Sequence, residues 1–156
     1  MNYKFIILLL LMFISIKKAQ AQDILKDMKC NNELWKYVYH PYRFQILEEC
    51  LAVTGTIVAG KQEADGDTHI LLKLDEGQEY LLYPFNIEKQ QGCLVLETVC
   101  VSEISQESAK GICEGYINDI PLPPIGARVL VIGTYVLDTK HSWSEIHPVS
   151  HIILIK

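Results

Sequence analysis

The hydrophobic and polar positions of the chain alternate in two neighbouring segments. From Leu51 to Ile57, within LAVTGTIVAG, every second residue is apolar or glycine, as on one face of a strand. The segment THILLKLD (68–75) alternates in the same way. Between them, ADGDTH contains an Asp-Gly pair that tolerates the positive φ of a tight turn. These segments predict an antiparallel hairpin that turns at Asp65-Gly66.

Three later segments also have strand patterns: CLVLETVCVS (93–102), ARVLVIGTYVLD (127–138) and 143–155. Between the first two, apolar residues from Ala109 to Ile117 recur at i, i+3, i+4, i+7 and i+8, which predicts a helix face. Ser105 is a suitable N-cap, and the prolines of INDIPLPP end the helix. EYLLYPFNIEKQQG is ambiguous, a short extra strand followed by a loop. The expected order is β-β-β-α-β-β.

The first 21 residues have the layout of a secretory signal peptide. A basic start precedes a 12-residue apolar run and the cleavage signal Ala19-Gln20-Ala21. A membrane-spanning helix needs roughly 20 apolar residues. The pair Lys17-Lys18 is unusual before a cleavage site and leaves a retained membrane anchor as the alternative. We expect a secreted or periplasmic protein with a signal peptide (1–21), an N-terminal arm (22–49) and one barrel domain (50–156).

The mature chain is strongly acidic. The leader holds three lysines and no acid, so 11 basic residues remain against 19 acidic residues, a net charge of −8 instead of −5. Such a surface repels phosphate backbones, which disfavours general nucleic-acid binding. The remaining length suits one domain, and we expect a monomer that meets a small or polymeric ligand outside the cytoplasm.

Five cysteines in an exported chain favour disulfides, and none of their spacings is Cys-x-x-Cys. Cys100 ends the third predicted strand and Cys113 lies on the inward face of the predicted helix, so we expect this pair. Cys50 begins the first strand, and Cys30 is its expected partner, which would fasten the arm to the barrel. Cys93 is left over.

Five strands with a helix between the third and fourth resemble the OB-fold, a five-stranded Greek-key barrel. GARVLVIGTYV resembles the fourth-strand region of many OB domains. With VTGTI, DGDTHI, YVLD and EIHPV, the chain also resembles a group of exported bacterial and archaeal OB-like proteins of unknown function. This resemblance implies a shared fold and site but no activity.

In OB-folds the loops between strands one and two and between strands four and five rise at the binding side of the barrel. The resemblance therefore implies that ADGDTH and DTKHSWSE lie close together. The expected ligand-binding residues come from these loops and the strands beside them: Asp65, Asp67, His69, Lys140, His141, Trp143, Glu145 and His147. Further stacking surface is expected from Tyr135 and Tyr83, and a local positive charge from Lys140.

Glu145 and His147 are two residues apart on a strand and so share a face, which leaves three interpretations of the cluster. With His69 they match the ligand types of a zinc site, with His141 or Asp67 as a further ligand. A divalent metal there would make the protein a metal-dependent hydrolase, including one acting on phosphodiesters. The same residues also suit a structural hydrogen-bond network or direct acid/base catalysis. Because no catalytic motif is present, we favour a non-enzymatic binding module.

Overall fold

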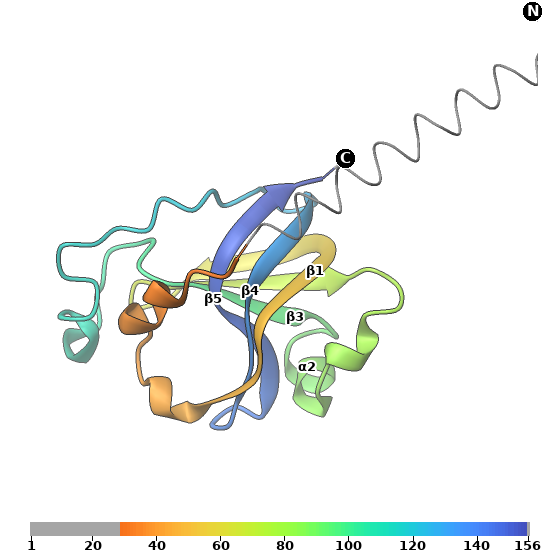
Figure 1. Ribbon diagram of the computed structural model, residues 1–156, viewed down its shortest axis with the longest axis horizontal. Helices are drawn as coiled ribbons and strands as arrows, with labels where there is room; N and C mark the ends of the chain where they lie inside the picture. The colour runs from red at the N-terminus through yellow and green to blue at the C-terminus, as the bar shows by residue number, and fades with distance from the viewer. Residues whose placement is uncertain (1–28, 156) are drawn as a thin grey trace, which may run out of the picture.

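The structure, a computed structural model, describes residues 29–155, which form five β-strands (Figure 1). The strands are β1 (Phe44–Gln62), β2 (Thr68–Leu74), β3 (Leu94–Thr98), β4 (Arg128–Asp138) and β5 (Trp143–Leu154). They close into a barrel in the order β1-β2-β3-β5-β4. The expected mainly β fold with five strands is confirmed. The predicted signal peptide lies outside the described residues.

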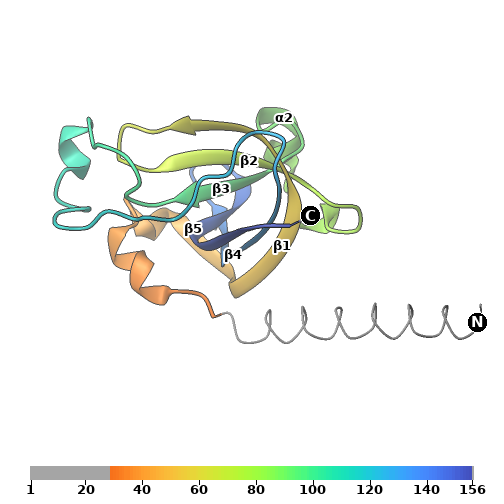
Figure 2. The ribbon, with the colours of Figure 1, turned by 90° about the horizontal axis from the view of Figure 1, so that it is seen from above.

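The strand pairing explains how the barrel closes. β1 is long and pairs antiparallel with β2 through one part of its length and with β4 through another. β2 continues antiparallel to β3, and β3 pairs in parallel with β5, where Val95 lies opposite Glu145. Figure 2 shows β1 curving around the barrel beside β2, with β3 on the other side of β2. The predicted hairpin between β1 and β2 is present, with Gly66 at a positive φ of 97°.

Along β2 and β3, successive side chains point alternately into the core and to the outer surface of the barrel. Ile70 and Leu72 of β2 and Leu96 of β3 lie in the main hydrophobic core. The alternate residue Leu71 packs in a separate cluster with Val95 on the outer face of the same strands. Burying each of these side chains contributes roughly 1.5–3 kcal/mol. The polar residues that alternate with these core residues along the strands therefore lie on the outer face, beside Leu71 and Val95.

Two mid-strand glycines allow strands to approach closely. A Cβ at Gly133 would lie 2.5 Å from Cγ2 of Ile146 and 2.6 Å from the carbonyl oxygen of Pro148. A Cβ at Gly55 would collide with the carbonyl oxygen of Lys73. The β4–β5 register shifts on both sides of Gly133, as expected where a glycine marks a bulge.

The segment before the barrel consists of two 3₁₀ helices, η1 (Asn32–Tyr37) and η2 (Pro41–Arg43). β1 begins at Phe44 and not at Cys50, where the first strand was expected to begin. The physical reason is pairing: β4 extends to Asp138, and its last residues hydrogen-bond with β1 from Phe44 onward. The disulfide Cys30–Cys50 joins the segment to β1, as predicted.

The ambiguous segment between β2 and β3 forms helices and no extra strand. These are η3 (Glu79–Leu81) and α2 (Pro84–Lys89). Pro84 suits the first turn of α2 because that turn leaves its N–H groups unbonded. The Asn86 side chain accepts from the Tyr83 N–H at 3.0 Å and donates to the carbonyls of Cys93 and Ser144 at 3.0 and 2.9 Å. These bonds fasten α2 to β5.

The predicted helix around Ala109–Ile117 is wrong. The structure has a 3₁₀ helix, η4 (Glu107–Ala109), followed by turns. Gly111 and Gly115 interrupt the segment, Gly115 has a φ of 72°, and each glycine disfavours an α-helix by about 1 kcal/mol. The disulfide Cys100–Cys113 nevertheless forms as predicted. The order in residues 29–155 is therefore β-β-α-β-β-β.

Within residues 29–155, no helix combines the length and apolar character that crossing a membrane requires. Two disulfides are typical of an oxidising compartment, and Cys93, the free cysteine of this part of the chain, is buried.

Candidate functional site

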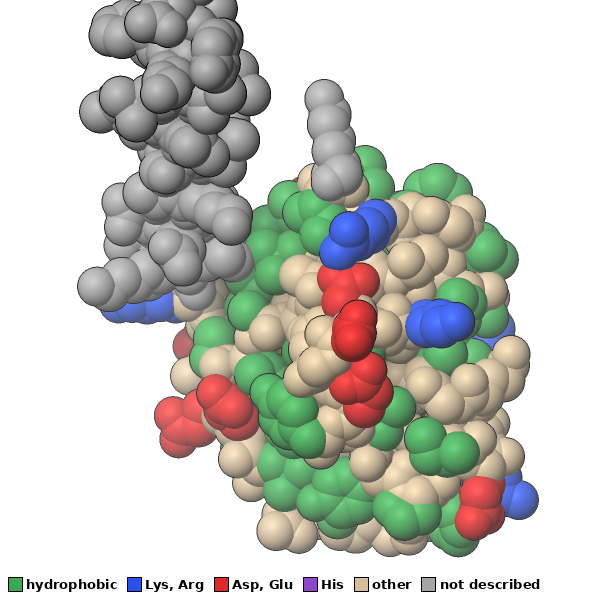
Figure 3. Space-filling view, turned by 90° about the vertical axis from the view of Figure 1, so that its right-hand side faces the viewer, with side chains coloured by type: hydrophobic (Ala, Val, Ile, Leu, Met, Phe, Trp, Pro, Cys, Tyr) green, Lys and Arg blue, Asp and Glu red, His purple; other side chains and the backbone are tan. Residues whose placement is uncertain are grey.

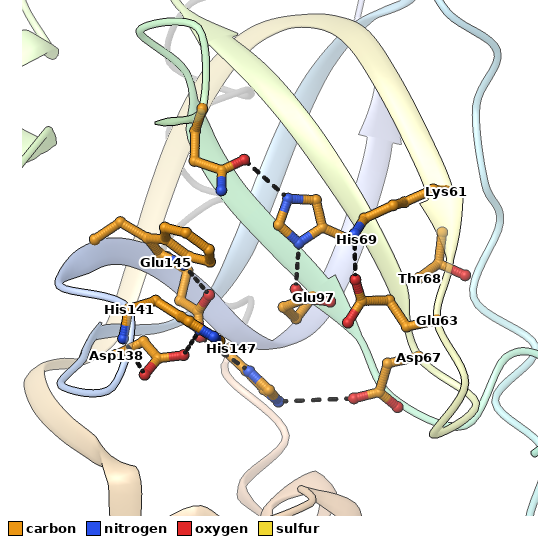
Figure 4. A network of polar contacts seen from close by, with 12 residues as sticks. Lys61, Glu63, Asp67, Thr68, His69, Glu97, Asp138, His141, Glu145 and His147 are labelled. Atoms are coloured by element: carbon orange, nitrogen blue, oxygen red, sulfur yellow. Dashed lines mark hydrogen bonds and ion pairs between the residues drawn. The ribbon is translucent and has the colours of Figure 1, made fainter. Parts of the chain in front are cut away.

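A polar network covers the outer face of β2, β3 and β5 (Figure 4). Strand register places His69 opposite Glu97 between β2 and β3. It also places Val95 opposite Glu145 between β3 and β5. Since every second residue shares a face, Glu97 lies beside Glu145 and His147 on this surface. All four polar side chains are buried.

His69 lies between two oxygen acceptors. Its Nδ1 is 2.6 Å from Oε1 of Glu97, and its Nε2 is 3.2 Å from Oε1 of Gln90. A protonated imidazole donates from both nitrogens, so it satisfies both oxygens at once. Burial lowers the pKa of His69, but the hydrogen bond and negative charge of Glu97 outweigh burial and raise this pKa. The geometry therefore favours a charged His69.

Glu97 has one satisfied oxygen and one free oxygen. Burial raises its pKa, the hydrogen bond from His69 opposes that shift, and the nearby charge of Glu145 adds to it. Its Oε2 is buried and has no hydrogen-bond partner among the described residues. A buried acceptor without a partner costs about 1–3 kcal/mol.

A second chain of contacts runs through β5. Glu145 accepts from Nε1 of Trp143 at 3.1 Å, and its other oxygen lies 3.2 Å from Nδ1 of His147. The remaining nitrogen of His147 is 4.0 Å from Oδ2 of Asp67 and has no hydrogen-bond partner in residues 29–155. Burial lowers the pKa of His147, but Glu145 and the other nearby carboxylates raise it overall.

Asp67 connects the β1–β2 turn to the rest of the barrel. Its Oδ1 accepts from the backbone N–H of Cys100 at 3.1 Å. Burial raises the pKa of Asp67 to about 8, even though the charge of His147 acts in the opposite direction. At neutral pH the carboxyl is therefore mostly protonated. Asp67 and His147 are only 5% and 3% exposed, so this contact is structural and sealed from solvent.

The β4–β5 turn contributes a third group of polar residues. Nδ1 of His141 lies 2.8 Å from Oδ2 of the fully buried Asp138, which also pairs with Arg43 at 3.0 Å. The His141 ring stacks on Trp143 with centroids 4.5 Å apart. Backbone N–H groups of Lys140 and His141 donate to Asp138, which holds the turn in place.

These groups surround a pocket of about 540 Å³, a volume typical of small-molecule sites. Its lining residues come from β1, β2, β3 and β5, from η2, from the end of α2 and the residues after it, and from the two flanking turns. The lining residues are Arg43, Ala59, Gly60, Lys61, Glu63, His69, Leu71, Lys89, Gln90, Gln91, Glu97, His141, Trp143 and Glu145.

The predicted site residues divide into three groups. His69, His141, Trp143 and Glu145 line the pocket. Asp67 and His147 do not line it; both are buried and they contact each other.

Asp65 and Lys140 do not line the pocket. Asp65 accepts from the backbone N–H of Asp67 at 3.3 Å within the turn, whereas the Lys140 side chain is exposed. Tyr135, expected as stacking surface, is buried in the main core, where its hydroxyl donates to the Leu81 carbonyl at 2.7 Å. Tyr83 caps α2 and is not a lining residue.

The proposed metal ligands His69, Glu145 and His147 occupy one network but do not converge as a ligand set. Both nitrogens of His69 face protein oxygens, and Nδ1 of His147 faces Glu145. In the described part of the chain, no three His, Cys, Asp or Glu side chains are arranged to hold a metal ion.

Sequence reasoning missed Glu97, Gln90 and Arg43. Glu97 carried a signal, because it is a charged residue inside the apolar strand LVLET, on the same face as Val95. Gln90 and Arg43 gave no such signal, since a helix end and a 3₁₀ turn bring them to the pocket. No protein-family model matches the chain, and no curated protein matches it either.

Proposed function

We propose that this protein is an exported OB-fold module that binds a small molecule, or one unit of a polymer, on the outer face of β2, β3 and β5. The strand order β1-β2-β3-β5-β4, with β1 paired to both β2 and β4 and β3 parallel to β5, supports the OB-fold assignment. OB-folds bind ligands on this side of the barrel, between the two turns that flank the pocket.

The single observation that carries the proposal is the pocket itself. It combines an aromatic side chain, Trp143, with apolar contact surface at Leu71 and Ala59. Most of the other lining residues are polar or charged, among them Glu97 and His69, which contact each other. Ligand sites are concave and combine apolar contact surface with fixed polar groups. No reaction is required to explain this arrangement, so a non-enzymatic binding module is the simplest function.

Charge and compartment narrow the class of partner. The acidic charge of the mature chain disfavours nucleic-acid binding. The face in Figure 3 carries acidic and basic side chains among hydrophobic ones, without an extended basic patch over its described residues. Two disulfides support an extracytoplasmic location. The proposed partner is therefore a ligand met outside the cytoplasm.

Tryptophan fluorescence provides a direct test. The chain has two tryptophans, and Trp35 packs away from the pocket, in the N-terminal cluster. A Trp35→Phe variant leaves Trp143 as the reporter. We expect its emission to change on titration with at least one of a set of oligosaccharides, peptidoglycan fragments, amino acids and short oligonucleotides. An Ala59→Trp substitution, which fills the pocket, should abolish binding in calorimetry. Binding that survives Ala59→Trp would place the ligand elsewhere and contradict the proposal.

A further inference from the structure

The segment that follows β3 forms a loop that the disulfide Cys100–Cys113 closes. The two cysteines are 13 positions apart, and the residues between them form η4 and turns. Residues 100–113 are called the disulfide loop below. Figure 2 shows this segment, drawn in teal, extending from the barrel beside the β1–β2 turn. Because short 3₁₀ turns are weakly hydrogen-bonded, the loop depends on the bond that closes it and on its contacts with the barrel.

The disulfide loop holds the β1–β2 turn by backbone hydrogen bonds. Four of its N–H groups donate to two carbonyl oxygens of the turn, those of Gly66 and Ala64. The donors are Val101, Ser102, Ser105 and Gln106, at 2.9, 3.0, 2.9 and 2.8 Å. The turn also packs closely on the loop, since a Cβ at Gly66 would lie 2.8 Å from Cγ1 of Ile104. The position of the turn therefore depends on the loop.

The same turn supports one wall of the pocket. The backbone carbonyl of Asp67 accepts from the Glu63 N–H at 2.8 Å, and its side chain accepts from the Cys100 N–H at 3.1 Å. Glu63 lines the pocket and pairs with Lys61, another lining residue. His69, just after the turn, lines it too. Asp67 thus connects the first residue of the disulfide loop to this wall.

The bond that closes the loop borders the surface. Both cysteines line a groove of about 550 Å³, with apolar surface from Val101 and Ile104 beside them. Cys100 is only 3% exposed, whereas Cys113 is partly exposed. A thiol that enters the groove therefore meets the sulfur of Cys113 first.

Thiol–disulfide exchange at this bond needs a dithiol as the reductant. Its thiolate attacks Sγ of Cys113 and forms a mixed disulfide, while the bond to Cys100 breaks and the Cys100 sulfur leaves with the electron pair and takes up a proton. The second thiolate of the dithiol then attacks the reagent's own sulfur in the mixed disulfide, which releases Cys113 as a thiolate that also takes up a proton. The two cysteines are thereby reduced, and the dithiol is oxidised to a disulfide.

We propose that Cys100–Cys113 is a thiol-exchange site, that a dithiol attacks it at Cys113, and that opening the bond releases the β1–β2 turn. Without the bond, the loop gains conformational freedom, and the four N–H groups that hold the turn are no longer kept in place by a closed ring. The redox state of the bond thus acts on one wall of the pocket. The other disulfide, Cys30–Cys50, fastens the N-terminal segment to β1 instead.

Two double variants isolate the bond. In Cys30→Ala/Cys50→Ala, dithiothreitol can open only Cys100–Cys113; in the control Cys100→Ala/Cys113→Ala, it can open only Cys30–Cys50. Hydrogen exchange is followed by mass spectrometry without denaturant, on peptides that cover residues 99–107. Dithiothreitol should speed this exchange by about tenfold or more in the first variant. The control should exchange fast from the start and should not respond to dithiothreitol.

Two single variants test which sulfur is attacked. Cys100→Ala leaves the thiol of Cys113, and Cys113→Ala leaves the thiol of Cys100. Ellman's reagent should react with Cys113 faster than with Cys100 by about tenfold or more, because the thiolate must be accessible to react. The buried Cys93 is present in both variants and provides the same background.

Each part of the proposal can fail separately. If dithiothreitol opens Cys100–Cys113 only at the rate of global unfolding, the bond is not an exchange site. If the bond opens and exchange in 99–107 stays unchanged, it does not hold the turn. If Cys100 reacts as fast as Cys113 while both single variants keep their circular dichroism spectra, the attacked sulfur is wrong.

The unsubstituted protein provides the same tests where a variant does not fold. N-ethylmaleimide trapping and peptide mapping then follow the opening of each disulfide, and brief treatment with glutathione followed by acid should leave glutathione on Cys113. Glutathione on Cys100 would contradict the proposal. None of these measurements uses a ligand of the pocket, so their outcomes are independent of the proposed binding function.

Discussion

Replacing Asp67 by asparagine should stabilise the folded protein at alkaline pH while changing little at acidic pH. The carboxyl is buried, its Oδ1 accepts from the Cys100 N–H, and its Oδ2 lies 4.0 Å from Nε2 of His147. Asparagine keeps the acceptor for Cys100. Its amide nitrogen faces the unpartnered His147 nitrogen and can donate to it when His147 is neutral.

The sign and the size of the expected change in the free energy of unfolding follow from the pKa of Asp67. Burial raises the pKa of Asp67 from 3.8 to about 8, so the folded protein retains a proton that the unfolded chain releases. The stability contributed by Asp67 is therefore complete below the unfolded pKa and is lost as the pH rises towards the folded pKa. At about 1.4 kcal/mol per pKa unit, the shift sets an upper limit on the order of 6 kcal/mol. Because His147 and water penetration offset part of this cost, we expect a gain of about 2 kcal/mol at pH 9.

Urea unfolding of the oxidised protein at pH 5, 7 and 9 measures the effect. The gain of Asp67→Asn over the unsubstituted protein should grow with pH, while the dependence on urea concentration stays the same. Asp65→Asn, a matched change in the same turn, should show no such growth. Asp67→Ala, which removes the acceptor for Cys100, should destabilise at every pH. If Asp67→Asn is less stable than the unsubstituted protein at pH 9, an ionised Asp67 supports His147 and the reasoning is wrong.

Three further predictions concern the barrel. In urea unfolding, Gly133→Ala should lower the free energy of unfolding by about 2 kcal/mol or more, because its Cβ would lie 2.5 Å from a β5 side chain. The control Gly111→Ala, whose Cβ meets no atom within 4 Å, should stay within about 1 kcal/mol of the unsubstituted protein. Replacing both Cys100 and Cys113 by alanine should cost about 3 kcal/mol, read from the shift in urea midpoint, and an unchanged midpoint would contradict a structural role. Tyr135→Phe should lower the free energy of unfolding by about 1 kcal/mol, because it removes the buried hydrogen bond to the Leu81 carbonyl, and an unchanged urea midpoint would contradict this role.

Alternation and turn chemistry along the chain were enough to predict the five strands and the first hairpin. Both signals are local, since one buried face requires a period of two and an Asp-Gly turn requires a positive φ. Both disulfides were also predicted, although the helix used to argue one of them is absent. The apolar residues between β3 and β4 recur with the period of a helix, which led to the wrong prediction. That pattern takes no account of Gly111 and Gly115, whose backbone freedom opposes a helix.

The candidate site depended much more on tertiary structure. The sequence determined that Glu145 and His147 share a face, because they are two apart on one strand, but it could not say whether that face lies inside or outside the barrel. The register shift beside Gly133 decides this, since it lets both Ile146 and Val149 reach the core and leaves Glu145 outside. Pairing of β2 with β3 then brings Glu97 to His69, a contact between residues 28 positions apart that no local pattern encodes. Composition and spacing thus determined the strands and the residue types, whereas the pocket exists only because barrel closure brings separate strands and turns to one face.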